Sequence, residues 1–270
     1  MEKIIIYQLL PRLFGNDNPH PQFNGTITQN GCGKMNDITT TALKKIKQLG
    51  ITHIWYTGLL EHATQTDYSA FGIRKDHSAM VKGRAGSPYA VKDYYDIDPD
   101  LASQPNKRFE EFQQLLERTH REGLRFVMDF IPNHVARQYH SDRKPQGVKD
   151  LGEDDSTSQA FNQQNNFYYI PYTPLHCSFD MKGNEPQPYE EMPAKATGND
   201  CFTPSPGRND WYETVKLNYG VDYLGGHIQR FYPIPNTWEK MLEILLFWAR
   251  QGVDAFRCDM AEMVPCEFWD

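Results

Sequence analysis

The sequence lacks any long hydrophobic run and any excess of positive charge. No stretch of its 270 residues reaches the ~18 consecutive apolar residues that a membrane-spanning helix needs, so we expect a soluble protein with no membrane partner. Lys and Arg number 28 against 35 Asp and Glu, which gives a net charge of -7 and a pI near 5.7. A protein that binds phosphate backbones carries a basic face, so this charge argues against a nucleic-acid partner and suits a neutral substrate.

Cysteine is also scarce, and its spacing carries no metal or disulfide signature. The five cysteines are an odd number and contain no C-x-x-C pair, so the sequence indicates neither a zinc site nor a disulfide framework. The apolar run Ile4-Ile5-Ile6-Tyr7 is too short for a signal peptide, and no A-x-A cleavage site follows it. We therefore expect reduced thiols and a cytoplasmic protein, or a secreted or periplasmic one if a leader has been removed.

What the sequence does contain is an alternation of short apolar runs and amphipathic helices. The apolar runs predict strands at residues 4–10, 51–57, 125–131 and 253–258. Leu43, Ile46 and Leu49 fall three apart and predict the buried face of one intervening helix, which Gly50 ends. Strands that alternate with helices are typical of a parallel sheet covered by helices, so we expect an α/β fold.

The last predicted strand ends in two charged residues. Arg257 and Asp259 stand two apart at its C-terminal end, and residues two apart in a strand point to the same side. In a (β/α) barrel the C-terminal ends of the strands form the reactive face, so a guanidinium and a carboxylate there indicate chemistry. A structural ion pair would show the same two residues, and this strand alone does not decide between the two interpretations.

Two motifs that close predicted strands carry a resemblance to a known family. Asp129-Phe130-Ile131-Pro132-Asn133-His134 has the pattern D-x-x-x-N-H, and Ala255-Phe256-Arg257-Cys258-Asp259 differs from G-F-R-x-D only at its first residue. In this order, each preceded by an amphipathic helix, they resemble glycoside hydrolase family 13, the α-amylase family. The resemblance runs from Ile6 to about Trp269 and implies a (β/α)8 TIM barrel with an irregular subdomain inserted after the third strand.

The resemblance divides the chain into three segments. Residues 1–134 would form the first part of the catalytic barrel, residues 135–217 the inserted subdomain, and residues 218–270 the barrel as far as its fourth strand. The middle segment shows no persistent period and is too long for an ordinary loop. Its aromatic residues would either stack on sugar or form its core, and a core is the commoner outcome for Tyr168, Tyr169, Tyr172 and Trp211.

The same resemblance assigns roles to single residues. Asp259 is implied to be the nucleophile of a retaining glycosidase, and Arg257 to keep that carboxylate ionised and oriented. Tyr89 lies in a stretch that resembles the family's G-Y-x-x-x-D-Y-x-x-I block, so it would stack under the sugar ring, or else pack the long loop that carries it. His134 would donate a hydrogen bond to a sugar hydroxyl, and Asp129 would brace the site from behind.

A calcium ion is a further implication of the resemblance. Asn133 would offer its carbonyl oxygen to an ion that pins the insertion to the barrel, which is a suitable ligand for a hard cation. Where the family often has His four residues after the nucleophile, this chain has Met263, which weakens any calcium contact offered there.

The number of strands is the largest departure from the family pattern. Four predicted strands use up the chain, whereas a barrel has eight. The family's general-acid Glu follows the fifth strand and its second Asp follows the seventh, so neither has a counterpart here. We expect the chain to be the N-terminal part of a longer enzyme, with the C-terminal half of that enzyme as its partner, and to be inactive alone.

The predicted function is hydrolysis of α-1,4-linked glucans or maltooligosaccharides with retention of configuration. A glucan transglycosylase of the same family shares the nucleophile, so it stays an alternative. A non-catalytic carbohydrate-binding or partner module of the same fold is a second alternative. Such relatives typically lose the nucleophile, and the presence of Asp259, Arg257 and His134 favours an enzyme.

Overall fold

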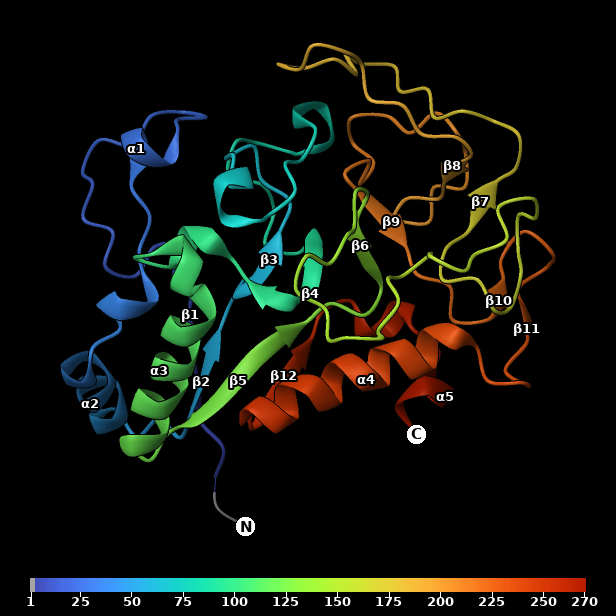
Figure 1. Cartoon of the computed structure of the whole chain (residues 1–270). Coiled ribbons are helices and arrows are strands. Elements are labelled where there is room, and N and C mark those ends of the chain that lie inside the picture. Colours follow the sequence, from blue (N-terminus) through green and yellow to red (C-terminus); the bar gives the residue numbers. More distant parts are fainter. Residues whose placement is uncertain (1–2) are drawn as a thin grey trace.

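A parallel sheet forms the centre of the molecule. The computed structural model describes residues 3–270, and helices pack beside the sheet while a long irregular segment lies at one end of it (Figure 1). In spatial order the strands of the sheet are β1 (Ile6–Leu9), β2 (His53–Tyr56), β5 (Arg125–Phe130) and β12 (Ala255–Cys258). The four predicted strands are all present, each shorter than predicted at one end or both.

Three helices join these strands, and two single turns of helix accompany them. The long helices are α2 (Thr40–Gln48), α3 (Arg108–Arg121) and α4 (Asn236–Gln251), and the single turns are α1 (Ile27–Asn30) and α5 (Cys266–Trp269). The side chain of Thr39 accepts a hydrogen bond from the backbone N–H of Ala42, which caps the start of α2. Leu43 and Ile46 are buried as predicted. The prediction for Leu49 was wrong, because Leu49 follows the last helical residue and is 71% exposed.

Four antiparallel pairs of short strands build the loops around the sheet. The pairs are β3 (Leu60–His62) with β4 (Val91–Ile97), β6 (His134–Ala136) with β9 (Thr214–Lys216), β7 (Tyr169–Ile170) with β8 (Ala194–Lys195), and β10 (Val221–Asp222) with β11 (Ile228–Gln229). The β6–β9 pair brings the two ends of the predicted insertion side by side (Figure 1). The long segment between β6 and β9 is therefore attached to the sheet through paired strands.

Aromatic side chains fill the layer between the sheet and the helices. The rings of Tyr56 on β2 and Phe126 on β5 lie 4.4 Å apart, and Phe112 on α3 meets Trp248 on α4 at 5.2 Å. Trp248 Nε1 also donates a hydrogen bond of 2.7 Å to the carbonyl of Tyr94. Each such ring contributes about 1.5–3 kcal/mol through burial, so this layer holds α3 and α4 in place.

The sheet keeps two edges in the part of the chain that the structure describes. These edges are β1 and β12, which pair only with β2 and β5 respectively. On the neighbouring α4, Leu242 is 54% exposed, so one apolar face of this helix is uncovered. Among residues 3–270, none of the helices has the length and apolar character to cross a bilayer.

Candidate active site

Asp129, Arg257 and Asp259 meet at the carboxyl ends of β5 and β12. The parallel register places Arg257 beside Asp129, and the backbone N–H of Asp259 donates to the carbonyl of Phe130. Arg257 Nη1 lies 2.8 Å from Asp259 Oδ1 and 3.5 Å from Asp129 Oδ1. One guanidinium therefore contacts both carboxylates. Arg257 and Asp259 point to the same side of the strand, as the spacing predicts.

Asp129 is the buried member of this group. Its Oδ1 accepts a hydrogen bond of 2.8 Å from Trp55 Nε1, and its Oδ2 accepts one of 3.0 Å from the backbone N–H of Gly58. Burial, only partly offset by these donors and by Arg257, raises the pKa of Asp129 to about 6. The two oxygens of Asp129 are therefore occupied by contacts with Trp55, Gly58 and Arg257.

Two aromatic rings lie close to Arg257. The guanidinium carbon is 4.8 Å from the centre of the Trp55 ring and 5.7 Å from the centre of the Tyr89 ring. Cation–π contacts of this kind stabilise the guanidinium beside Asp259. Tyr89 thus contacts Arg257 directly.

Asp259 lines an open cavity of about 290 Å³. The other residues of its wall come from the long loop after β3, from β6 and β9 and the residues just before β9, and from the end of the sheet; they are Ser87, Tyr89, His134, Trp211, Glu213, Thr214 and Met260. The Asp259 side chain is 13% exposed, so it is accessible from this cavity. Three of the sequence candidates, Asp259, Tyr89 and His134, are therefore brought together around one space.

His134 is held in one tautomer by a chain of hydrogen bonds. Lys216 Nζ donates to Asn133 Oδ1 at 2.9 Å, which turns the amide nitrogen of Asn133 toward Gly198 and His134. Because this amide nitrogen donates to His134 Nδ1, the proton of the neutral ring sits on Nε2. Burial first, and the charge of Lys216 second, lower the pKa of His134 to about 4, while a hydrogen bond with the Tyr89 backbone acts the other way.

Lys216 also bears on the expected calcium ion. Its ammonium lies within 2.6 Å of Asp200 Oδ1 and bonds the same Asn133 oxygen that a calcium ion would need. A lysine ammonium already supplies the positive charge at this point, and it occupies the Asn133 and Asp200 oxygens that a cation would bind. The residues present at Asn133 therefore do not fit a calcium ion.

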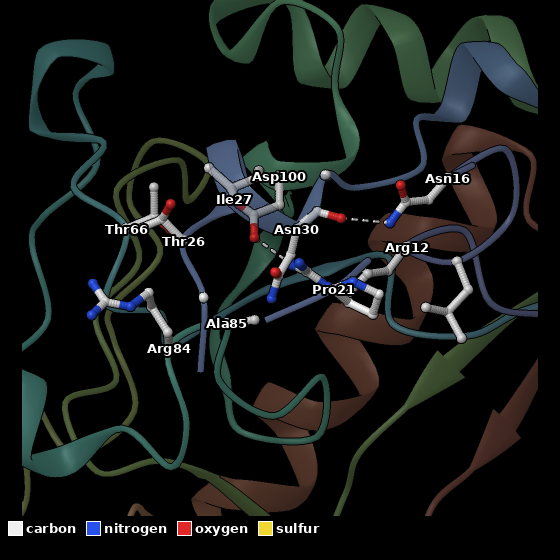
Figure 2. A pocket seen from close by; sticks show the side chains of 13 residues that line it. Arg12, Asn16, Pro21, Thr26, Ile27, Asn30, Thr66, Arg84, Ala85 and Asp100 are labelled. Atoms are coloured by element: carbon white, nitrogen blue, oxygen red, sulfur yellow. Dashed lines mark hydrogen bonds and ion pairs between the residues drawn. The ribbon is translucent and has the colours of Figure 1, made fainter. Parts of the chain in front are cut away.

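A second cavity, of about 220 Å³, lies between the loop after β1 and the loop after β3 (Figure 2). Arg12 crosses its wall and pairs with Asp100 and, at 3.4 Å, with Asp98. On the far side, Arg84 Nε donates to the carbonyl of Asn24 at 3.1 Å. Arg12 thus ties the loop after β1 to the segment that follows β4, and Arg84 ties it to the loop after β3.

The structure separates the aromatic residues of the insertion. Tyr168 and Tyr169 are buried, in agreement with a role in the core. The expectation of a core position was wrong for Tyr172, which is 80% exposed. It was also wrong for Trp211, which lines the cavity with its ring 5.2 Å from that of His134, because it stands just before β9 where the insertion returns to the sheet.

Several residues of the site were missed by sequence reasoning. Trp55 and Gly58 hold Asp129, and Lys216 orients Asn133, yet none was a candidate. The one available signal was Lys216 itself, a lysine between the apolar residues Val215 and Leu217. A buried lysine in a strand needs a partner, which points to an acceptor elsewhere in the chain.

A parallel sheet with helices packed beside it, and an arginine and two carboxylates at the carboxyl ends of its strands, is typical of α/β enzyme domains. The comparison with protein families agrees and is more specific. Residues 8–268 match the family described as alpha amylase, catalytic domain, and the chain belongs to this family, glycoside hydrolase family 13. The family fold is the (β/α)8 barrel.

Individual relatives are distant and longer. An alpha-glucosidase of Culex pipiens is 24% identical over 94% of this chain and 32% of its own length. An amino acid transporter heavy chain of Mus musculus is 24% identical over 96% of this chain and 29% of its own length. Among solved structures, this chain resembles the maltose complex of the cyclic alpha-maltosyl-(1→6)-maltose hydrolase from Arthrobacter globiformis. The match has a TM-score of 0.55 and 18% identity, and it covers 98% of this chain and 46% of that one, which shows a shared fold. The chain spans about a third of the length of these curated relatives.

Proposed function

We propose that the enzyme containing this chain is a retaining hydrolase of α-1,4-linked glucans or maltooligosaccharides, with Asp259 as its nucleophile. The observation that carries the proposal is the position of the Asp259 carboxylate. It faces a cavity, it is held at 2.8 Å by Arg257, and it shares that cavity with Tyr89 and His134. A carboxylate beside a fixed cation stays ionised and oriented, as attack on an anomeric carbon requires.

The surrounding side chains supply binding and positioning in this proposal. Tyr89 offers a ring face for the apolar side of a pyranose, and Trp211 offers a second aromatic surface across the cavity. His134 lines the cavity and presents its ring to the sugar, and it stays neutral at physiological pH because its pKa is lowered to about 4. Asp129 holds Arg257 from behind and does not touch the sugar.

The proton donor of the reaction comes from outside residues 1–270 in this proposal. Retaining enzymes use two carboxyl groups about 5–5.5 Å apart, and the family supplies the acid after its fifth strand. We propose that β1, β2, β5 and β12 are the first four strands of an eight-stranded barrel, with residues 135–217 inserted after the third. The C-terminal half of the enzyme would then complete the ring and bring the acid to the cavity.

A second candidate is a module of the same fold without catalysis. The similarity to an amino acid transporter heavy chain supports this second candidate, because the name of that relative describes no glycosidase. The retained Asp259–Arg257 pair argues for the enzyme, and the same pair fits a transglycosylase. Product analysis separates these two: hydrolysis yields shorter reducing sugars, whereas transfer also yields longer chains.

The test is turnover by the full-length enzyme on maltooligosaccharides. We expect Asp259→Asn to lower kcat by roughly 10⁴-fold or more, as loss of a nucleophile does. Glu262→Gln removes an exposed carboxyl three residues further on and serves as the matched control with unchanged kcat. Residues 1–270 alone should give no turnover. Full activity of Asp259→Asn, or an inverted anomer as the first product seen by proton NMR, would refute the proposal.

A further inference from the structure

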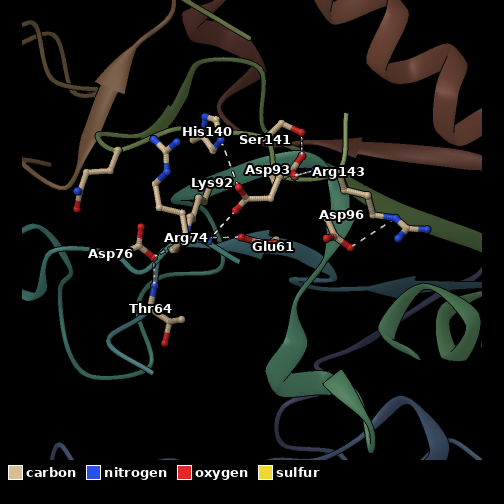
Figure 3. Close-up of polar contacts among 12 residues, drawn as sticks. Glu61, Thr64, Arg74, Asp76, Lys92, Asp93, Asp96, His140, Ser141 and Arg143 are labelled. Atoms are coloured by element: carbon tan, nitrogen blue, oxygen red, sulfur yellow. Dashed lines mark hydrogen bonds and ion pairs between the residues drawn. The ribbon is translucent and has the colours of Figure 1, made fainter. Parts of the chain in front are cut away.

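A cluster of buried carboxyl groups lies between β3 and β4, outside the cavity that holds Asp259. Glu61 comes from β3, and Asp93 and Asp96 come from β4 (Figure 3). Each offers one carboxylate oxygen, and these oxygens all lie within 4.8 Å of one another. The three residues are 1%, 0% and 0% exposed, so solvent does not separate their charges.

The strand pairing forces two of these carboxylates to face each other. Glu61 is the cross-strand partner of Asp93, and the register shifts on both sides of Glu61. Like charges directly opposite each other destabilise a ladder, and bulges often serve to aim a side chain. The local backbone is thus irregular at the residue that brings the third carboxylate into the cluster.

Asp93 and Asp96 are held in place by protein donors. Asp93 Oδ1 accepts from the Ser141 hydroxyl at 2.7 Å, and its Oδ2 accepts from the backbone N–H of Arg143 at 3.1 Å. Arg108 grips Asp96 through Nε at 3.0 Å and Nη2 at 2.5 Å. These donors fix two carboxylates in orientation before any ligand arrives.

Glu61 differs from both, because neither of its oxygens has a hydrogen-bond partner in the described part of the chain. The nearest cation is Lys92, whose Nζ lies 3.7 Å from Glu61 Oε1, beyond hydrogen-bond distance. Lys92 instead bonds the carbonyl of Arg74 and lies 3.4 Å from Asp76. A buried carboxylate with two free oxygens is costly unless something binds it.

Protonation alone does not resolve this cost. A protonated Glu61 would still keep an oxygen that needs a donor, and neither of its oxygens accepts a hydrogen bond within residues 3–270. The charges are also unequal. The buried carboxyls Glu61, Asp76, Asp93 and Asp96 face two buried cations, Lys92 and Arg108, while the Arg143 side chain is 46% exposed and 4.0 Å from Asp96.

We propose that Glu61, Asp93 and Asp96 bind one calcium ion. The donors are oxygen only, which suits a hard cation, and the two free oxygens of Glu61 suit the bidentate grip that calcium accepts. Calcium–oxygen distances of about 2.3–2.6 Å place opposite ligands about 4.6–5.2 Å apart, which accommodates the spread of these oxygens. Magnesium demands near-ideal octahedral geometry and gives up its waters reluctantly, so a buried cluster of carboxylates suits it less well than calcium.

The ion would connect the β3–β4 ladder to the active site. Tyr89 stands two residues before β4, so the ladder that carries the ligands also carries the ring that lines the cavity. Calcium at Glu61 would lock the irregular ladder and thereby the position of Tyr89. This site is distinct from Asn133, whose oxygen is bonded to Lys216.

The test is calcium binding to the chain after dialysis against EDTA, which needs no glycosidase activity. Isothermal titration with calcium chloride should show one ion per chain, with weaker binding of magnesium. Glu61→Gln should raise the Kd roughly tenfold or more. Glu117→Gln, which removes an exposed carboxyl on α3, should leave the Kd unchanged. Calcium should also raise the melting temperature of the wild type and Glu117→Gln, but not of Glu61→Gln.

Two results would overturn the proposal. One is a wild-type chain that takes up no calcium at millimolar concentration and melts at the same temperature with and without EDTA. The other is a folded Glu61→Gln variant that binds calcium as tightly as the wild type. If circular dichroism shows that Glu61→Gln is unfolded, Asp93→Asn replaces it, and unchanged calcium affinity in that variant has the same meaning.

Discussion

Lys216 offers the sharpest test of how the cavity is organised. The substitution Lys216→Met keeps a side chain of similar length and removes the ammonium that bonds Asn133 Oδ1 at 2.9 Å and Asp200 Oδ1 at 2.6 Å. It takes away the second-largest cause of the low pKa of His134 and leaves the largest, which is burial. The pKa of His134 should therefore rise from about 4 but stay below its ordinary value of 6.5.

The effect on stability follows from the same contacts. Asn133 Oδ1 loses its donor in a buried place, which costs about 1–3 kcal/mol, while the relief from burying an ammonium offsets part of that cost. We expect the unfolding free energy at pH 7 to fall by no more than about 3 kcal/mol. Since the pKa of His134 is lowered by folding, wild-type stability falls as the pH drops from about 6.5 toward 4, and the variant should lose part of this slope.

The assay is NMR of the histidine ring nitrogens as a function of pH, combined with urea unfolding. In the wild type, His134 should show the Nε2–H form at neutral pH and begin to titrate only near pH 4. Lys240→Met is the control. It removes a half-buried ammonium on α4 that donates to the backbone carbonyls of Lys149 and Asp150, and it should leave the pKa of His134 unchanged. An ordinary pKa for His134 in the wild type, or the same pKa in Lys216→Met, would refute the reasoning.

Two further predictions concern stability. Because burial raises the pKa of Asp129 to about 6, the wild type should lose stability as the pH rises from about 4 to 6. The variant Asp129→Asn should not show this loss, so its urea unfolding free energy relative to the wild type should rise by up to about 3 kcal/mol over this pH range. Parallel pH curves of the two proteins would contradict the prediction. Gly86→Ala should lower the melting temperature more than Gly83→Ala. Both glycines have positive φ, +76° and +71°, so the left-handed conformation costs about 1–2 kcal/mol in each variant. A Cβ at Gly86 would in addition lie 1.8 Å from the Ala63 carbonyl oxygen, whereas a Cβ at Gly83 meets nothing within 4 Å. Equal melting temperatures of the two variants would contradict the prediction.

Local patterns predicted the sheet and the pair at its end for a physical reason. The period of two along a strand places Arg257 and Asp259 on one side, and short apolar runs mark strands covered on both faces. The exposure of Leu49 was not predicted, because periodicity does not show where a helix ends. Leu49 lies one residue beyond the end of α2 and is exposed.

Contacts between distant segments were beyond such patterns. Lys216 meets Asn133 across 83 positions of sequence, and Trp55 meets Asp129 across 74. No spacing rule connects residues so far apart, and each looks ordinary in its own stretch. The facing of Glu61 and Asp93 was hidden in the same way, since it depends on the register of a ladder interrupted by two shifts.

The β6–β9 ladder connects three walls of the cavity. His134 opens β6, Trp211 stands just before β9, and the backbone of Asp259 is bonded to Phe130, four residues before His134. Since the two strands pair over only three residue pairs, a substitution that breaks this pairing should shift both aromatic rings relative to the Asp259 carboxylate.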